Sequence, residues 1–137
     1  MTATVPETII PASHIDLLTA PGFGHLATVG PGGAPQVNPV GYLWTGEQVL
    51  ISVEATTQKL RNIRREPRVA ISFLDSRNPA RYLEIRGEVR AITPDVDDAL
   101  RSALLQRYLR DGQTVTPPPP GERFTLAITP LRVTKHG

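Results

Sequence analysis

The stretch Arg81-Tyr-Leu-Glu-Ile-Arg-Gly-Glu-Val-Arg-Ala-Ile92 alternates apolar and polar residues along most of its length. One side of the alternation carries Leu83, Ile85, Val89 and Ala91, and the other carries Tyr82, Glu84, Arg86, Glu88 and Arg90. Successive side chains of a β-strand point to opposite faces of a sheet, so this period of two predicts a strand with one buried and one polar face. Strands of this kind are typical of antiparallel sheets.

Outward from this strand, apolar runs separated by glycine and proline turns predict five more strands, at residues 24–29, 35–44, 48–54, 68–74 and 124–133. Helices are expected at about 13–20, where Ser13 and Asp16 resemble a capping box, at 57–65 before Pro67, and at 94–110. Pro39 cannot donate to a sheet ladder, so it indicates an edge, a bulge or a ligand beside the second strand.

Six strands joined largely by hairpins, with few helices, predict a mainly β protein built as a six-stranded antiparallel barrel. A doubly wound parallel fold would need a helix after nearly every strand, and the sequence does not supply them. The length of 137 residues suits one domain over residues 1–137. Residues 1–12 are expected to form a flexible tail, and residues 112–121 a proline-rich linker to the last strand.

The composition limits the classes of function. Cysteine is absent, which excludes disulfides and thiolate metal sites, and the histidines are too dispersed to indicate a metal site. We see no signal peptide and no apolar segment of about 20 residues that would span a membrane, so a cytoplasmic protein without membrane contact is expected. Aromatic residues make up only 5%, which offers few platforms for stacking nucleic-acid bases.

Charge is concentrated in one segment. The formal net charge is only +2, yet five of the fifteen basic residues lie between Lys59 and Arg68. Lys59 falls in the first turn of the helix predicted after Thr56 and Thr57, where the positive end of the helix dipole disfavours a cation unless an anion binds there too. A solvated basic helix face is the alternative. The position favours a phosphate or carboxylate ligand.

Three blocks carry a family resemblance: Pro35-Gln-Val-Asn-Pro39, Lys59-Leu-Arg-Asn-Ile-Arg-Arg-Glu-Pro-Arg68 and Arg81-Tyr-Leu-Glu-Ile-Arg-Gly87. Together they resemble the split β-barrel superfamily that binds flavins and is related to pyridoxamine 5′-phosphate oxidase. Within it, the sequence is most similar to the actinobacterial branch that uses the deazaflavin coenzyme F-420. The resemblance implies an FMN-binding type of split barrel and a homodimer with its cofactor in a groove between the subunits.

The resemblance also implies roles for individual residues. Lys59 would grip the cofactor phosphate, Thr57 would occupy a neighbouring phosphate position, and Arg61 would substitute for the arginine that many relatives carry there. The ring system would lie along the strand segment formed by Gln36, Val37, Asn38 and Pro39. It would also lie beside the end of the third strand, at Ser52 and Val53. The named oxidase has a longer C-terminal part with substrate-binding residues, so oxidation of pyridoxamine 5′-phosphate is not expected.

The function expected on this basis is hydride transfer between F-420 and a small quinone-like or conjugated acceptor. Flavins and deazaflavins supply this chemistry themselves, which suits a sequence in which we assign no catalytic residue and no metal ligand. An FMN-dependent oxidoreductase of the same fold is the first alternative. A protein that binds or stores the cofactor without turnover is the second.

Several residues have a structural explanation beside the functional one. Asn38 would either contact the cofactor or satisfy backbone groups freed by Pro39. His25 is expected in the core or the barrel wall. Tyr42 and Trp44 are expected in packing or a subunit interface, with a wall of the substrate pocket as the alternative. Arg64 and Arg65 are expected on the surface, or in contact with the anionic polyglutamate tail of F-420.

Overall fold

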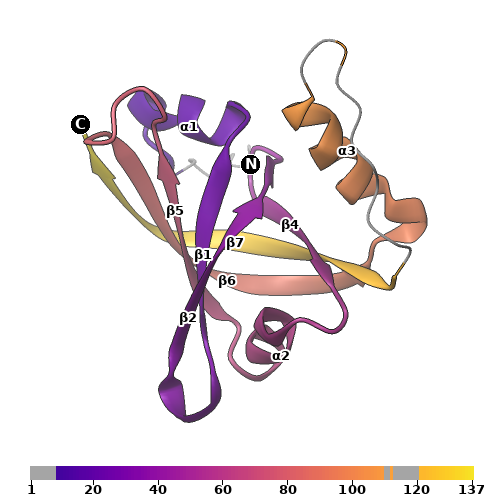
Figure 1. Ribbon diagram of the computed structural model, residues 1–137. Helices are drawn as coiled ribbons and strands as arrows, with labels where there is room; N and C mark the ends of the chain where they lie inside the picture. Colours follow the sequence, from indigo (N-terminus) through magenta and orange to yellow (C-terminus); the bar gives the residue numbers. More distant parts are fainter. Residues whose placement is uncertain (1–8, 110–111, 113–120) are drawn as a thin grey trace, which may run out of the picture.

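A computed structural model describes residues 9–109, 112 and 121–137, and it is built on one antiparallel sheet (Figure 1). The sheet has seven strands in the order β2-β1-β5-β6-β7-β4-β3. Their bounds are β1 (Phe23–Val29), β2 (Pro35–Gly41), β3 (Leu43–Trp44), β4 (Val49–Glu54), β5 (Arg68–Leu74), β6 (Tyr82–Pro94) and β7 (Arg123–His136). The predicted mainly β, antiparallel architecture is therefore confirmed.

The sheet has one strand more than the six predicted, because the second predicted strand is divided at Tyr42. Its first part, β2, pairs with β1, and its second part, β3, pairs with β4. Tyr42 turns inward between them, and its buried hydroxyl donates a hydrogen bond of 2.6 Å to the carbonyl of Leu17. The chain thus changes partner strand at Tyr42, where the sequence shows a continuous run.

The first and third helices are shorter than predicted, whereas the second is close to its predicted length. The first is a 3-10 turn η1 (Ala12–His14) followed by α1 (Asp16–Thr19), and α2 (Gln58–Arg65) matches the helix expected at 57–65. A 3-10 turn η2 (Pro31–Gly33) joins β1 to β2, and η3 (Val96–Asp98) precedes α3 (Ala99–Tyr108). Thr93 and Pro94 stay in β6, so Asp95 begins the third helical region instead, with its carboxylate accepting from the N–H groups of Leu100 and Arg101.

The core lies on the concave side of the sheet, where the apolar faces of the strands meet. Its most deeply buried side chains include Leu18, Leu26, Ile51, Ile63, Ile71, Phe73, Leu83, Ile85, Leu126 and Ile128. Helix α1 covers one end of this core and α2 the other, while α3 runs beside the sheet (Figure 1). Ile63 comes from α2 and packs into this core, which fixes the helix that carries Lys59.

Two segments expected to lack regular structure fall mostly outside the described residues. Residues 1–8 of the expected tail are not described, whereas Ile10 is 4% exposed and belongs to the core. Of the expected linker at 112–121, only Gly112 and Gly121 are described.

Candidate functional site: the start of helix α2 and strand β2

Helix α2 begins where the sequence placed an anion site. Thr57 has the extended backbone of an N-cap residue, but its side chain does not cap the helix. Its hydroxyl donates instead to the carbonyl of Glu54, at 2.9 Å. The first turn holds no acidic residue, and Lys59 lies within it. Because backbone N–H groups point outward at a helix start, this end of α2 offers donors and positive charge to an anion.

The ammonium group of Lys59 is partly withdrawn from water. Burial lowers the pKa of Lys59 below its ordinary value of 10.5, and the nearby Arg123 guanidinium lowers it further, while Glu54 opposes both effects. A cation held beside another cation and partly desolvated gains more than an exposed one from a bound anion. The electrostatic setting of Lys59 therefore favours the approach of an anion.

Arg123 was not predicted as a site residue, yet it contacts Ser52 of the expected site and the neighbouring Glu54. Its Nε donates to the Ser52 hydroxyl at 3.0 Å, and its guanidinium pairs with Glu54 at 3.2 Å. The register of β4 and β7 places Arg123 opposite Glu54. No local pattern could have shown this, because the contact depends on the pairing of strands that are 71 residues apart at Ser52.

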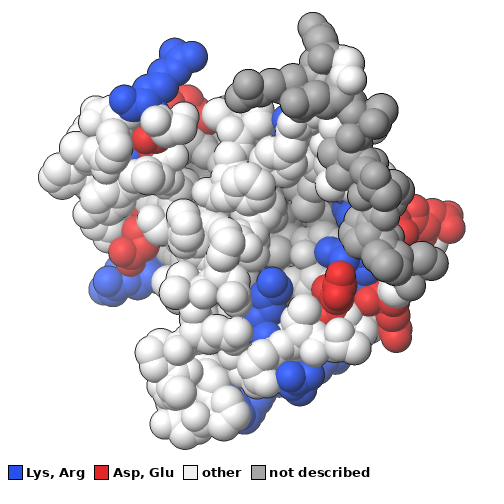
Figure 2. All heavy atoms as spheres, viewed as in Figure 1, with Lys and Arg blue, Asp and Glu red and all other residues white. Residues whose placement is uncertain are grey.

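The remaining basic residues of α2 surround this point. The Arg61 guanidinium folds back onto the helix start, donating to the Thr56 carbonyl at 2.9 Å and to Gln58 Oε1 at 2.8 Å. Arg64 lies over the Phe124 ring, 5.2 Å from its centroid, and Arg65 donates to the Val29 carbonyl at 3.2 Å. Figure 2 shows basic side chains over α2, with acidic ones beside them. The surface is positive but not uniformly so.

Strand β2, expected to carry the cofactor ring, forms one edge of the sheet. This explains Pro39, because an edge strand tolerates a residue without an N–H group. Val37 is 63% exposed and shares the outer face with Pro39. Gln36 and Asn38 are half-buried on the opposite face, opposite Thr28 and Leu26 of β1. Val37 and Pro39 therefore offer a flat apolar surface at the sheet edge.

The two halves of the expected site are physically connected. Gln36 of β2 accepts a hydrogen bond of 2.9 Å from Asn62 of α2, so the ring-lining strand and the phosphate-anchoring helix share a contact. Ser52 is half-buried beside Arg123, whereas the side chain of Val53 is 1% exposed and packs in the core. Val53 can meet a ligand only through its backbone.

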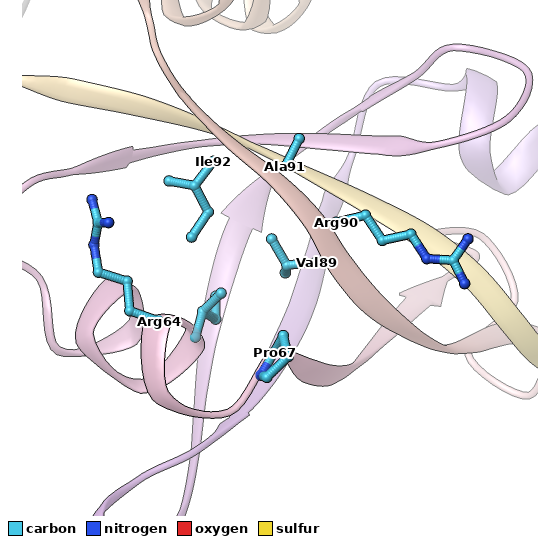
Figure 3. Close-up of a pocket in the computed structure, with 7 residues that line it drawn as sticks. Arg64, Pro67, Val89, Arg90, Ala91 and Ile92 are labelled. Carbon is cyan, nitrogen blue, oxygen red and sulfur yellow. The ribbon is translucent and has the colours of Figure 1, made fainter.

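An open groove of about 430 Å³ lies where α2 ends, and Arg64 is its one residue that was considered for contact with the cofactor. Its lining residues are Ile63, Arg64, Pro67, Val89, Arg90, Ala91 and Ile92. In Figure 3, Arg64 and Arg90 extend toward opposite sides, with Val89 and Pro67 between them. The groove is apolar at its centre and basic at its sides.

One histidine lies opposite Pro39 of the expected site, and the described residues show no cluster of metal ligands. His25, expected in the core or barrel wall, lies exposed on the outer face of β1. Within residues 9–109, 112 and 121–137, no three His, Asp or Glu side chains gather as a metal site would require. No helix among these residues is both long and apolar enough to cross a membrane.

The residues present fit a phosphorylated, ring-bearing cofactor. A half-buried lysine and an arginine lie at a helix start without acids in its first turn, which suits a phosphate. An exposed apolar edge strand is tied to the same helix, which suits a planar ring. The carboxylate of Glu54 is an unfavourable neighbour for a phosphate, and Arg123 already pairs with it.

Comparisons with solved structures agree with this architecture. The chain is 39% identical to a protein described as an F-420 reductase, over 91% of this chain and 98% of that one, with a TM-score of 0.83. A conserved hypothetical protein from Mycobacterium tuberculosis shares 23% identity over 98% and 89% of the two chains, at a TM-score of 0.71. General stress protein 26 from Bacillus anthracis shares the fold at 15% identity, 89% coverage of each chain and a TM-score of 0.64.

No curated protein matches the sequence. The sequence does match the family described as pyridoxamine 5′-phosphate oxidase, over residues 10–137. This match covers nearly all of the chain, and the fold is shared with solved structures of the same split-barrel type. The protein is therefore a member of the pyridoxamine 5′-phosphate oxidase family.

Proposed function

We propose that this protein is an oxidoreductase that binds the deazaflavin coenzyme F-420 and transfers a hydride between it and a small organic acceptor. The observation that carries the proposal is the pair of cations at the start of α2, half-buried Lys59 beside Arg123. The preference for F-420 over FMN rests on the relative described as an F-420 reductase, which is 39% identical over 91% of this chain.

In this proposal the protein holds and orients the cofactor. Lys59 and Arg123 bind its phosphate, with Thr57 and the helix start as hydrogen-bonding neighbours and Arg61 as a further cation. Val37 and Pro39 pack against the ring, with Gln36 and Asn38 behind them, and Ser52 fixes Arg123. F-420 supplies hydride chemistry when bound, so the acceptor is a small quinone-like or conjugated molecule. No side chain is assigned a proton transfer.

A homodimer is part of the proposal. The outer face of β2, β1 and β5 carries Val37, Phe23 and Leu74, which are 63%, 58% and 48% exposed. Exposed apolar residues on one sheet face favour contact with another protein surface. A second copy on this face would cover the edge strand and enclose the ring. Sedimentation of the purified protein tests this, and a monomer at micromolar concentration would contradict it.

Cofactor titration tests the central proposal. The protein is purified from a bacterial host that does not make F-420, and F-420 or FMN is then added while fluorescence or absorbance is followed. We expect a nearly colourless protein that binds F-420. A yellow protein carrying FMN would favour the FMN-dependent alternative, and F-420 binding without reduction of any quinone-like acceptor would favour a cofactor-binding protein. No spectral response to either cofactor would refute all three.

A variant then tests the anchor. Lys59→Ala removes a charged partner of the phosphate and should weaken cofactor binding by about 10- to 100-fold, the range for a hydrogen bond to a charged group. The matched control is Lys135→Ala, which removes the other lysine of the chain, a residue that donates to the Ser13 hydroxyl. Equal affinity in the two variants would remove Lys59 from the site.

A further inference from the structure

Asn62 is a polar residue inside the apolar interior between α2 and the sheet. It is 1% exposed, although it lies between Arg61 and the buried Ile63 on a basic helix. A buried amide is stable only when its donors and acceptors are paired. The partners of Asn62 therefore determine what this residue does in the fold.

Three elements meet at the Asn62 amide. Its Nδ2 donates to the Thr28 hydroxyl of β1 at 3.0 Å and to Gln36 Oε1 of β2 at 2.9 Å. Its Oδ1 accepts a hydrogen bond of 2.8 Å from Gln58, one turn earlier on α2. Both N–H donors are used, and they point to two different strands. Thr28 is itself only 2% exposed, so the bond between Asn62 and Thr28 is sealed from water, while Gln36 and Gln58 are half-buried.

This arrangement couples the two halves of the candidate site. Gln58 lies next to Lys59 at the anchoring end of α2, and Gln36 opens the strand segment assigned to the ring. A hydrogen-bonded amide has narrow preferences in distance and direction. The Asn62 side chain thus fixes the position of β2 relative to the start of α2, which apolar packing alone would define less sharply.

We propose that Asn62 is a positioning residue that sets the separation between the phosphate anchor and the ring-lining strand. The inference rests on the proposed function, because it concerns how the same cofactor is held. Asn62 is buried and touches no ligand in this proposal. It acts through Gln36 and α2, so its effect depends on a cofactor that contacts both halves at once.

A double-mutant cycle on F-420 affinity tests this dependence. Asn62→Leu removes the amide while keeping a similar volume, and it should weaken F-420 binding by about tenfold, within the range seen for coupled neighbours. In a Lys59→Ala background the phosphate has lost its contact to the helix that Asn62 positions, so Asn62→Leu should then change affinity less than about twofold. Additive effects of the two substitutions would overturn the proposal, as would an unchanged affinity of Asn62→Leu alone.

Tyr42→Phe is the matched control. It also removes a buried hydrogen bond, from the Tyr42 hydroxyl to Leu17, but at the α1 end of the barrel (Figure 1). All variants are measured at a temperature at which circular dichroism shows them folded. The control should bind F-420 as the unaltered protein does. If Asn62→Leu and Tyr42→Phe lose affinity equally, Asn62 has only a structural role.

A second variant and a second measurement keep the test decisive if Asn62→Leu does not fold. Asn62→Asp keeps the shape and the acceptor for Gln58 but loses both N–H donors, so the same cycle applies to it. In the cofactor-free protein, amide hydrogen exchange should then quicken together in residues 36–38 and 58–61. Exchange that quickens in α2 alone would overturn the coupling. Failure of the unaltered protein to bind either F-420 or FMN refutes the proposed function itself, and the inference falls with it.

Discussion

Arg123 Nε donates to the Ser52 hydroxyl at 3.0 Å, and this contact holds a second cation beside Lys59. The same guanidinium pairs with Glu54, so one arginine is shared between a neutral and an acidic partner on β4. Two cations in one partly buried place repel each other unless an anion joins them. Glu54 offsets part of this repulsion, and a further anion bound between Lys59 and Arg123 would offset more.

The pKa of Lys59 should report this repulsion directly. Arg123→Ala removes a positive neighbour and admits water, so the pKa of Lys59 should rise toward 10.5. Glu54→Gln removes the negative neighbour and should lower it further. Lysine-selective NMR titration can measure both changes, because the chain has only two lysines and Lys135 serves as the internal reference. Shifts in the same direction for both variants would contradict the arrangement.

A second prediction concerns Arg81, which ties the N-terminal turn to the sheet. Its guanidinium binds the Asp16 carboxylate through two nitrogens, at 2.6 and 2.9 Å, and reaches Asp75 at 3.1 Å. Hydrogen bonding to Arg81 lowers the pKa of Asp16 below 3.8, and the Arg77 N–H together with Arg81 lowers the pKa of Asp75. The stability linked to these carboxylates is therefore present above pH 3.8 and lost as the pH falls through the lowered values.

Arg81→Ala should consequently destabilise the protein most at neutral pH, and the difference from the unaltered protein should shrink as the pH falls below 3.8. Urea unfolding at several pH values measures this. Arg68→Ala is the control, because Arg68 pairs with Glu66 through a side chain that is 81% exposed and should matter little. A deficit of Arg81→Ala that stays constant down to pH 2 would show that its charge pairs are irrelevant.

Much of the fold follows from local sequence patterns. The alternation around Leu83 and Ile85 predicts a half-buried strand, and both residues are fully buried in β6. Thr57 and Pro67 bound a helix that the structure places at Gln58–Arg65. The alternation of a strand and the effect of a proline on a helix depend only on residues that are close in sequence. Such features can therefore be predicted without knowing the tertiary structure.

The features that could not be predicted depend on long-range contacts. The second strand is divided at Tyr42 because its two parts pair with different strands, and Arg123 is placed by the register of β4 and β7. Asp97 and Asp98 adopt positive φ angles of 56° and 53°, which no helix-start pattern indicates. In each case tertiary structure overrides a local preference.

The third prediction concerns Gly87, at a shift in the register between β6 and β7. A Cβ atom added there would lie 2.5 Å from the Thr129 carbonyl oxygen and 3.0 Å from Ile128 Cγ2. Backbone atoms of a central strand cannot move easily, so Gly87→Ala should lower the free energy of unfolding by about 1–3 kcal/mol. Thermal and urea unfolding measure the loss.

Gly121→Ala is the control for this substitution, since an added Cβ there would meet nothing within 4 Å. It should leave stability nearly unchanged, or raise it slightly by restricting the unfolded chain. If Gly87→Ala proves as stable as Gly121→Ala, the close approach of β6 and β7 at Thr129 is wrong.

The last prediction concerns alkaline stability and the buried hydroxyl of Tyr42. Burial raises the pKa of Tyr42 from 10.0 to about 12, although the Arg107 guanidinium, 5.5 Å from the ring centroid, opposes the change. Between these values the unfolded chain has lost the phenol proton while the folded protein keeps it. The folded state then binds more protons, so the free energy of unfolding falls as the pH rises above 10.

Tyr42→Phe should remove this contribution. At pH 7 the variant should be less stable by about 1 kcal/mol, because the hydrogen bond to Leu17 is lost. That deficit should narrow as the pH rises from 10 toward 12, since only the unaltered protein loses the stability linked to Tyr42. Tyr82→Phe, which keeps the Tyr42 hydroxyl, should follow the alkaline loss of the unaltered protein. Urea unfolding followed by circular dichroism measures all three proteins, and a Tyr42→Phe deficit that is the same at pH 7 and pH 11.5 would show that the hydroxyl titrates equally in both states.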